Sequence, residues 1–254
     1  MAKTLASNSP ATAAAAKKKL RYKRVLFKVS GEALMGGQSF GIDPATTARI
    51  AKEIAGAVKL GAQIAVVVGG GNIFRGVALA VNGANRVTGD QMGMLATVIN
   101  AMAMKMALQD AGVEAVILSA IAMPEFCQTF SQRALDKHLN AGAVVVFAAG
   151  TGNPYFTTDT GAALRACEMQ ADAIIKGTQV DGVYSADPKK HSKAERYTRI
   201  SHSQMLEKGL AVMDLSAVSL ARDAAIPIIV FALHQKGELL KILQGGGRCT
   251  IVAD

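Results

Sequence analysis

The chain has 254 residues, of which half are hydrophobic, 5% are aromatic and none is Trp. This length suits one large α/β domain or two small ones, and the aliphatic composition suits a parallel sheet covered by helices. No apolar run reaches the ~18 residues of a transmembrane helix. Three scattered cysteines without C-x-x-C spacing argue against a disulfide framework and a zinc site, so we expect a cytoplasmic protein with reduced thiols and no membrane partner.

The formal net charge of +9 is unevenly distributed along the chain. Seven of the 28 basic residues lie in the first 24 positions, so part of the charge belongs to a tail and part is available to an anionic substrate. Nucleic-acid binding is the rival explanation, but no interleaving of aromatic and basic residues supports it. Residues 1–20 are rich in Ala, Ser and Lys, which predicts a disordered tail before one ordered domain at 21–254.

The first predicted strand, residues 25–29, carries Lys28 among apolar neighbours. An unpaired lysine is costly to bury, so Lys28 either meets an anion or lies in solvent at a strand edge. Ser30 and Gly31 then begin a turn of small residues. After a glycine-rich loop, Asp43 is expected to cap a helix that begins with a proline.

The second predicted strand ends abruptly in Gly69-Gly70-Gly71, followed by Asn72 and Arg75. Glycines allow backbone N–H groups to approach a ligand oxygen, and unpaired N–H groups at a helix start favour an anion. Arg75 would add a forked donor to a phosphate. The alternative is a tight strand-to-helix turn without a ligand, and the spacing matches neither a dinucleotide fingerprint nor a P-loop.

A long helix is expected from about residue 89 to Ala111. Its many methionines indicate core or subunit packing more than a cofactor site. Asp90 stands at the expected start of this helix. It is either a plain N-cap or a carboxylate that accepts hydrogen bonds from ligand hydroxyls, and the residues alone leave both open.

A third glycine-bearing turn, residues 149–159, follows the apolar strand 143–148. It combines hydroxyls, an amide, aromatic rings and the carboxylate of Asp159, a composition suited to a polar ring and a phosphate. Lys176 stands at the end of a further strand. Strands alternate with helices throughout, which predicts an α/β fold with a largely parallel sheet, and such sheets bind ligands at the carboxyl ends of their strands.

The candidate polar residues are mostly basic or acidic groups near these strand ends: Lys28, Arg75, Asp90, Asp159, Lys176 and Asp187. Two lysines, an arginine and glycine-rich backbone suit the negative charge of a transferring phosphoryl group. No Ser-His-Asp arrangement and no His/Cys cluster is evident. The four histidines are expected at the surface: His138, His191, His202 and His234.

Several long motifs resemble those of the bacterial uridylate kinases, in the same order and over about residues 22–254. The motifs are residues 28–34, 69–76, 89–97, 149–159, 180–184, 186–188 and 212–214. The resemblance implies the amino-acid-kinase fold, a three-layer α/β/α sandwich with a largely parallel central sheet. It also implies an acceptor-binding part at about 21–170 and an ATP-binding part at about 171–254.

The same resemblance implies Mg²⁺-dependent phosphoryl transfer from ATP to UMP, giving ADP and UDP in pyrimidine nucleotide biosynthesis, by a homohexamer. The residues it assigns to ATP are Lys28, Val29, Ser30, Gly31, Gly71, Arg75, Thr178, Tyr184 and Asp187. Those it assigns to UMP are Gly70, Asp90, Thr151, Gly152, Asn153, Pro154, Tyr155, Phe156, Thr157 and Thr158. Arg75 falls at the boundary between the ATP and UMP phosphates, so the resemblance leaves open which of the two substrates it binds.

In the catalytic roles that the resemblance implies, Lys28 and Lys176 neutralise the transferring group. Asp159 orients a lysine or the metal shell, while Mg²⁺ is held mainly by the nucleotide phosphates without a direct protein ligand. A phosphate monoester has a second pKa of about 6 and is already nucleophilic at neutral pH, so no general base is required.

Regulation is where the sequence departs from the family. GTP as activator and UTP as inhibitor are the effectors that the resemblance implies. Gln109 and Val116 occupy positions where GTP-activated members carry His and Arg, which argues against GTP activation. A loop similar to the family's effector loop is present, formed by Gly36, Gly37, Gln38, Ser39, Phe40 and Gly41.

Two alternatives accompany this interpretation. One is another small-molecule kinase of the same fold, acting on carbamate or an amino-acid carboxylate. The other is a catalytically silent nucleotide-binding regulator, which loss of Lys28 or Asp159 would have favoured; both residues are present.

Overall fold

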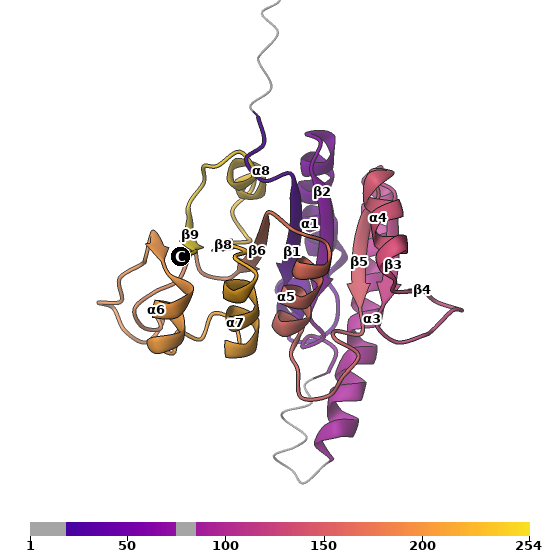
Figure 1. The fold of residues 1–254 in the computed structure, drawn as a ribbon. Coiled ribbons are helices and arrows are strands. Elements are labelled where there is room, and N and C mark those ends of the chain that lie inside the picture. The colour runs from indigo at the N-terminus through magenta and orange to yellow at the C-terminus, as the bar shows by residue number, and fades with distance from the viewer. Residues whose placement is uncertain (1–18, 75–84) are drawn as a thin grey trace, which may run out of the picture.

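The computed structural model describes residues 19–74 and 85–254. Arg75 and most of the expected N-terminal tail therefore lie outside the described residues. Over the described ranges the chain forms a layered α/β structure (Figure 1).

A single mixed sheet of nine strands runs through the described residues, in the order β4-β3-β5-β2-β1-β6-β8-β9-β7. The strands are β1 (Arg24–Val29), β2 (Gln63–Val68), β3 (Ala115–Ser119), β4 (Gln128–Thr129), β5 (Val144–Ala148), β6 (Ala173–Thr178), β7 (Arg199–Ile200), β8 (Ile228–Ala232) and β9 (Cys249–Val252). Within this sheet only β8 and β9 pair antiparallel. The expected largely parallel α/β sheet is confirmed.

Helices cover both faces of the sheet (Figure 1). They are the 3₁₀ helix η1 (Gly31–Met35) and the α-helices α1 (Pro44–Lys59), α3 (Arg86–Asp110), α4 (Gln132–Asn140), α5 (Thr158–Glu168), α6 (His202–Glu207), α7 (Leu215–Asp223) and α8 (Glu238–Leu243). Buried residues of α1, α3 and α8 form one core cluster, and those of α4, α5, α6 and α7 form the other. The expected three layers are thus confirmed. No helix in the described ranges is both long and apolar enough to cross a membrane.

Helix boundaries differ from the prediction where a polar side chain caps the helix earlier. The side chain of Asn85 accepts from two backbone N–H groups and begins α3 at Arg86, so Asp90 lies inside the helix. The N-cap alternative for Asp90 is therefore wrong. Likewise, Thr157 caps α5, which places Asp159 in its first turn rather than in a loop.

The glycines after β2 lead into a hydrogen-bonded turn. The N–H groups of Ile73 and Phe74 both donate to the carbonyl of Gly70, at 3.0 and 2.9 Å. The predicted helix start would continue from this turn into residues 75–84, which lie outside the described residues. The turn itself brings the backbone of the three glycines together.

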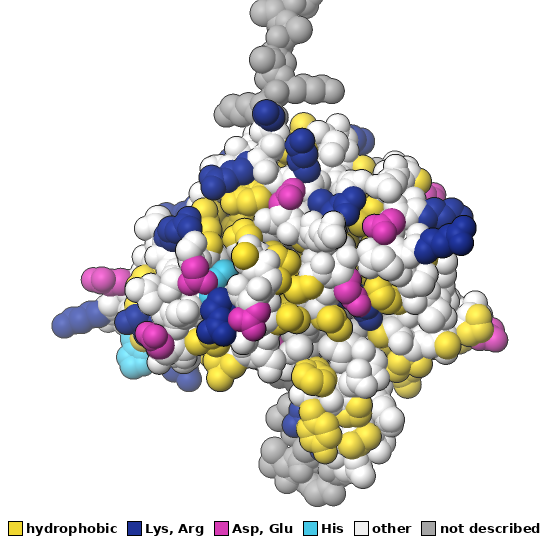
Figure 2. All heavy atoms as spheres, in the orientation of Figure 1, with side chains coloured by type: hydrophobic (Ala, Val, Ile, Leu, Met, Phe, Trp, Pro, Cys, Tyr) yellow, Lys and Arg dark blue, Asp and Glu magenta, His cyan; other side chains and the backbone are white. Residues whose placement is uncertain are grey.

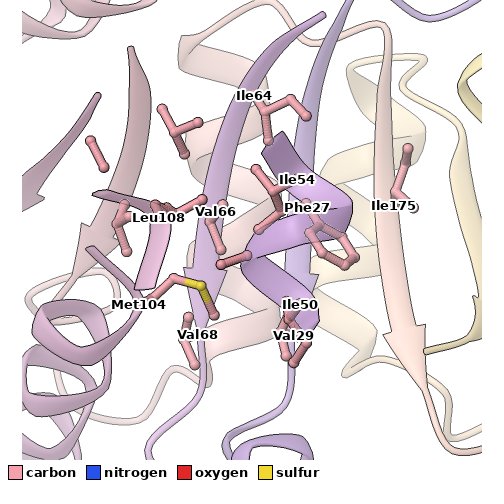
Figure 3. Packing of buried hydrophobic residues seen from close by; sticks show 14 of the residues in the cluster. Phe27, Val29, Ile50, Ile54, Ile64, Val66, Val68, Met104, Leu108 and Ile175 are labelled. Atoms are coloured by element: carbon pink, nitrogen blue, oxygen red, sulfur yellow. The ribbon is translucent and has the colours of Figure 1, made fainter. Parts of the chain in front are cut away.

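The central strand β1 lies between β2 and β6, and its side chains are buried on both faces. Phe27 and Val29 point toward α1, where Ile50 and Ile54 pack against them (Figure 3). Lys28 alternates with these residues and is only 5% exposed. The alternative of a solvent-exposed edge position for Lys28 is therefore wrong, because parallel neighbours flank β1 on both sides.

One histidine departs from the expected surface position. His202 is 2% exposed, with Nδ1 3.0 Å from an oxygen of Asp254 and Nε2 3.1 Å from the carbonyl oxygen of Ile226. A buried imidazole needs such partners. His202 thus links α6 to the C-terminal residue and to the segment before β8.

The surface shown in Figure 2 carries lysine, arginine and acidic side chains interspersed with one another. On this face the charges do not gather into a continuous basic surface. Hydrophobic side chains collect at its lower end, where α3 projects beyond the sheet in Figure 1.

The packing of α1 on β1 generates a stability prediction. Ile54→Ala removes a fully buried side chain from this contact and should lower the free energy of unfolding by about 2–5 kcal/mol. Urea denaturation followed by circular dichroism measures it. Lys52→Ala, on the exposed side of the same helix, should change it by less than about 0.5 kcal/mol. Equal effects of the two changes would contradict this account of the core.

Candidate active site

Two lysines lie next to each other at the carboxyl ends of the central strands. Lys28 of β1 is the direct register partner of Lys176 of β6. Because side chains alternate along a strand, both lysines share the sheet face of Leu26 and Ile174, which α5 covers. Lys28 is 5% and Lys176 7% exposed, so two ammonium groups are buried side by side.

Asp159 in the first turn of α5 pairs with both lysines. Its Oδ1 lies 2.7 Å from Nζ of Lys28, and its Oδ2 lies 2.6 Å from Nζ of Lys176. A carboxylate in this position is also stabilised by the positive end of the helix dipole. The structure thus brings together the three residues to which the resemblance gave catalytic roles.

The charges in this cluster shift each other's pKa values. Burial would raise the pKa of Asp159, but the ammonium groups of Lys28 and Lys176 outweigh it and hold the pKa below its usual range. Burial, together with repulsion from Lys28, lowers the pKa of Lys176 to about 8, although Asp159 opposes this shift. Asp159 is therefore ionised near neutral pH, and Lys176 is charged but close to losing its proton.

A further contact ties this cluster to the segment before α7. Nζ of Lys176 donates to the carbonyl oxygen of Val212 at 2.5 Å. Nearby, Asp214 caps α7 and accepts from the hydroxyls of Thr157 and Thr160. Sequence reasoning gave Val212 and Asp214 no role, although they stand in one of the motifs that carry the resemblance.

The turns after β1 and β2 touch each other through glycine. A Cβ atom added at Gly31 would lie 2.6 Å from the carbonyl oxygen of Gly69 and 2.8 Å from the amide nitrogen of Gly71. One added at Gly70 would lie 2.8 Å from the carbonyl oxygen of Gly93 in α3. Only glycine allows this approach, which places the turn of Ser30 and Gly31 against the second turn.

A pocket of about 290 Å³ opens between the turn after β2, α3 and the loop after β5. Its lining includes many residues that the resemblance assigned to UMP: Gly70, Asp90, Thr151, Asn153, Phe156, Thr157 and Thr158. Gly152, Pro154 and Tyr155, assigned to the same ligand, do not line it. Gly71, which the resemblance assigned to ATP, also lines the pocket. The remaining lining residues had no role predicted from the sequence: Phe74, Arg86, Gly89, Gly93, Met94, Thr97 and Gly150.

The carboxylate of Asp90 already has partners in this pocket. Both of its oxygens lie 2.9 Å from Nε of Arg86, and Oδ2 accepts from the backbone N–H of Tyr155 at 2.8 Å. The bond to Tyr155 joins α3 to the loop after β5 across the pocket. Tyr155 is 66% exposed, and the guanidinium of Arg86 lies over its ring, 5.4 Å from the ring centroid.

A second pocket of about 440 Å³ lies between the loop 180–188 and the segment 208–212. Tyr184 and Asp187, two residues that the resemblance assigned to ATP, line it. Thr178 does not: its hydroxyl donates to the carbonyl of Val180 and shapes the turn after β6. The sequence did not predict that the segment 208–212 lines this pocket, because nothing in its composition indicates that it faces a loop about twenty residues earlier in the chain.

The donor set suits a divalent cation that arrives with a nucleotide. No cluster of three or more His, Cys, Asp or Glu side chains that could hold a metal occurs among the residues described. Mg²⁺ is commonly held by substrate phosphates, water and one or two carboxylates, without a dedicated protein cage. Asp159 is the carboxylate closest to the two lysines and could reach such an ion through its hydration shell.

Comparisons with known proteins agree with this geometry. The model of the amino acid kinase family matches residues 23–232. The chain is 65% identical over 233 residues to the uridylate kinase of Rhizobium meliloti (strain 1021), covering 92% of this chain and 97% of that protein.

Solved structures agree as well. A UMP kinase from Bacillus anthracis superposes with a TM-score of 0.88 at 35% identity, over 92% of this chain and 96% of the other. One from Ureaplasma parvum gives a TM-score of 0.87 at 35% identity, over 92% and 100%. The chain therefore belongs to the amino acid kinase family, and within it to the uridylate kinases.

Proposed function

We propose that this chain transfers the γ-phosphoryl group of ATP to UMP, giving ADP and UDP, a step of pyrimidine nucleotide biosynthesis. The observation that carries the proposal is the position of the Lys28–Asp159–Lys176 cluster between two pockets. Thr158, next to Asp159, lines the first pocket, and Val212, the acceptor from Lys176, lines the second. Charge is thus concentrated where ligands from the two pockets would meet.

The chemistry requires positioning and charge neutralisation more than proton transfer. A phosphoryl group in transfer carries negative charge on its equatorial oxygens, which the ammonium groups of Lys28 and Lys176 would stabilise. The UMP phosphate is mostly dianionic near neutral pH and needs no base, since its second pKa is about 6. Asp159 pairs with the two lysines and holds them at fixed positions, and it favours the charged form of Lys176.

The first pocket suits UMP. Asp90 would accept hydrogen bonds from the ribose hydroxyls, Gly70 would donate its N–H to the phosphate, and residues 151–158 would surround uracil and phosphate. Asp90 must share its oxygens with Arg86 and the N–H of Tyr155, but carboxylate oxygens have about four acceptor sites in total.

The second pocket suits the adenosine of ATP, between Tyr184 and Asp187, with Thr178 shaping its edge. The phosphates would run along Lys28, Val29, Ser30 and Gly31 toward Gly71, and Arg75 would join them at the boundary with UMP. This places the acceptor in residues 21–170 and most of the ATP site in residues 171–254 of a single domain, after a tail at 1–20. Mg²⁺, when bound to the phosphates, would neutralise the part of their negative charge that the two lysines leave uncompensated.

We further propose that the enzyme is a homohexamer of the cytoplasm. Exposed apolar side chains on α3 recur at spacings of three and four residues: Met92, Leu95, Ile99, Met102 and Met106. Such a seam suits packing against another helix, here that of a second copy. The three cysteines are unpaired, as a reducing compartment favours.

Allosteric regulation by GTP and UTP, with residues 36–41 as effector loop, stays a prediction, and Gln109 and Val116 argue against GTP activation.

The test of the activity is ADP release with ATP and Mg²⁺, comparing UMP, CMP, dUMP and AMP as acceptors. Turnover with UMP alone is expected. Equal turnover with CMP would contradict the role of residues 151–158 in selecting uracil. No turnover with any acceptor, in folded protein that binds ATP, would instead favour a silent regulator.

Asp90→Ala should raise the KM for UMP by about tenfold or more and leave the KM for ATP within about twofold, because a hydrogen bond to a charged group contributes about 1.5–3 kcal/mol. Steady-state kinetics with each substrate varied measures this. Asp110→Ala, an exposed change at the other end of α3, is the control. An equal loss for both substrates would move Asp90 out of the acceptor site.

The lowered pKa of Lys176 predicts a decline of kcat/KM for ATP as pH rises through about 8, because the free enzyme then loses the charge of Lys176. Lys176→Arg keeps its charge at every pH tested and should remove the decline in whatever activity remains. A wild-type profile that stays flat to pH 9.5 would contradict the assignment.

Ile99→Glu places a charge in the middle of the exposed seam of α3. It should reduce the hexamer to smaller species, because burying an unpaired carboxylate opposes association. Light scattering after size exclusion measures the mass, with Lys52→Glu on α1 as the control. An unchanged mass would exclude this seam from the subunit contacts.

A further inference from the structure

A buried pair of asparagines lies directly behind the glycine turn that follows β2. Asn72 in the turn is 1% exposed, and Asn100 in the middle of α3 is 0% exposed. Their amides bond to each other in both directions: Nδ2 of Asn72 donates to Oδ1 of Asn100 at 3.0 Å, and Nδ2 of Asn100 donates to Oδ1 of Asn72 at 2.6 Å. Neither residue touches the first pocket.

The second N–H of each amide reaches the backbone of a different loop. Asn100 donates to the carbonyl oxygen of Gly69 at 2.6 Å, and Asn72 donates to that of Gly41 at 2.9 Å. In return, the N–H of Gly41 donates to the carbonyl oxygen of Asn72 at 2.9 Å. All four side-chain N–H donors therefore have acceptors, so the pair forms a closed network without an unsatisfied donor.

Burying polar amide groups destabilises the folded state unless hydrogen bonds compensate for the lost hydration. Asparagine is a weaker helix former than alanine or leucine, and a buried amide must keep its hydrogen bonds to be tolerated. After Asn100 the inner side of α3 is apolar, with Met104 and Leu108 packed into the core (Figure 3). An aliphatic residue would satisfy the core equally well, so packing alone does not account for Asn100.

Three loops meet at this pair. Gly69 and Asn72 hold the glycine turn, and Gly41 ends the loop 36–41. A Cβ added at Gly31 would lie 2.5 Å from Oδ1 of Asn72, so the turn after β1 also rests against the pair. The two amides thus connect the glycine turn to α3, to the loop 36–41 and to the turn after β1.

We propose that Asn100 is a positioning residue for phosphoryl transfer, acting through Asn72 to hold the turn 69–71 and the loop 36–41 in one fixed arrangement. This rests on the proposed function, in which the turn donates N–H groups to the phosphates of both substrates. Asn100 touches neither substrate. It acts as the rigid support from α3 that the flexible glycines themselves lack.

The test is Asn100→Asp, which keeps the shape but replaces the two N–H donors with an oxygen that faces the acceptors of Gly69 and Asn72. We expect kcat to fall by about tenfold to a hundredfold, the loss typical of a misplacement of about 1 Å. ATP binding, which depends mainly on the second pocket, should stay within about threefold. Met104→Ala, a buried change one turn further along α3, is the matched control: it should lower thermal stability and leave kcat per folded molecule unchanged.

A second measurement is independent of the acceptor and of turnover. Hydrogen exchange should become at least about tenfold faster in Asn100→Asp at the amides of Gly41, Ile73 and Phe74, which the turn protects. It should not do so selectively in Met104→Ala.

Three results decide the inference. Unchanged exchange at these amides would overturn it whatever the enzyme's acceptor proves to be. Faster exchange with an unchanged kcat would also overturn it, because the pair would then be structural only. If the wild-type protein failed to turn over UMP, the proposed function would fail, while the exchange data would still decide whether Asn100 holds the turn.

Discussion

The structure depends on burying two ammonium groups next to each other. Lys28 and Lys176 are register partners in the centre of the sheet, where water is excluded and their repulsion is strong. Each buried charge costs several kcal/mol unless it is paired. Asp159 pairs with both lysines and offsets this cost, and it is held there because Thr157 caps α5 two residues before it.

The pairing of one carboxylate with two lysines explains why two buried ammonium groups suit the proposed function despite the free energy that their burial costs. An ion pair that satisfied both lysines completely would be inert, whereas one carboxylate between two ammonium groups leaves net positive charge. That excess suits an anion that arrives only when substrates bind. Burial lowers the pKa of Lys176, and repulsion from Lys28 lowers it further, so the negative charge of an arriving phosphate would favour the protonated lysine.

Glycine and asparagine perform complementary tasks around this centre. Gly31 and Gly69 let the turns after β1 and β2 approach each other within distances that no Cβ permits, and Gly70 lets the second turn approach α3 in the same way. Flexible backbone of this kind needs an external support, and the Asn72–Asn100 pair connects it to α3. The same helix carries the exposed apolar seam on its other side, so one element serves both the pocket and the proposed subunit contact.

Much of this could be predicted from the sequence, because the strands are short apolar runs that end in glycine or lysine. The alternation of strands and helices predicted the parallel sheet, and the motifs contain many of the residues that line the two pockets. The sequence did not indicate that Asn85 and Thr157 begin their helices early, since a capping hydroxyl or amide resembles any other polar loop residue. Nor could it show that Lys208–Val212 faces the loop around Tyr184, or that Asn100 meets Asn72, because these contacts join distant segments.

The central claim is that Asp159 holds two charged lysines for the transferring phosphoryl group. The most direct measurement is the single-turnover rate of Asp159→Asn with saturating ATP, Mg²⁺ and UMP, alongside its melting temperature and that of Asp136→Asn, a half-buried control on α4. The account predicts a rate at least about a hundredfold lower in a protein that remains folded, because a preorganised charge is lost from the site. A rate within twofold of the wild type would contradict it.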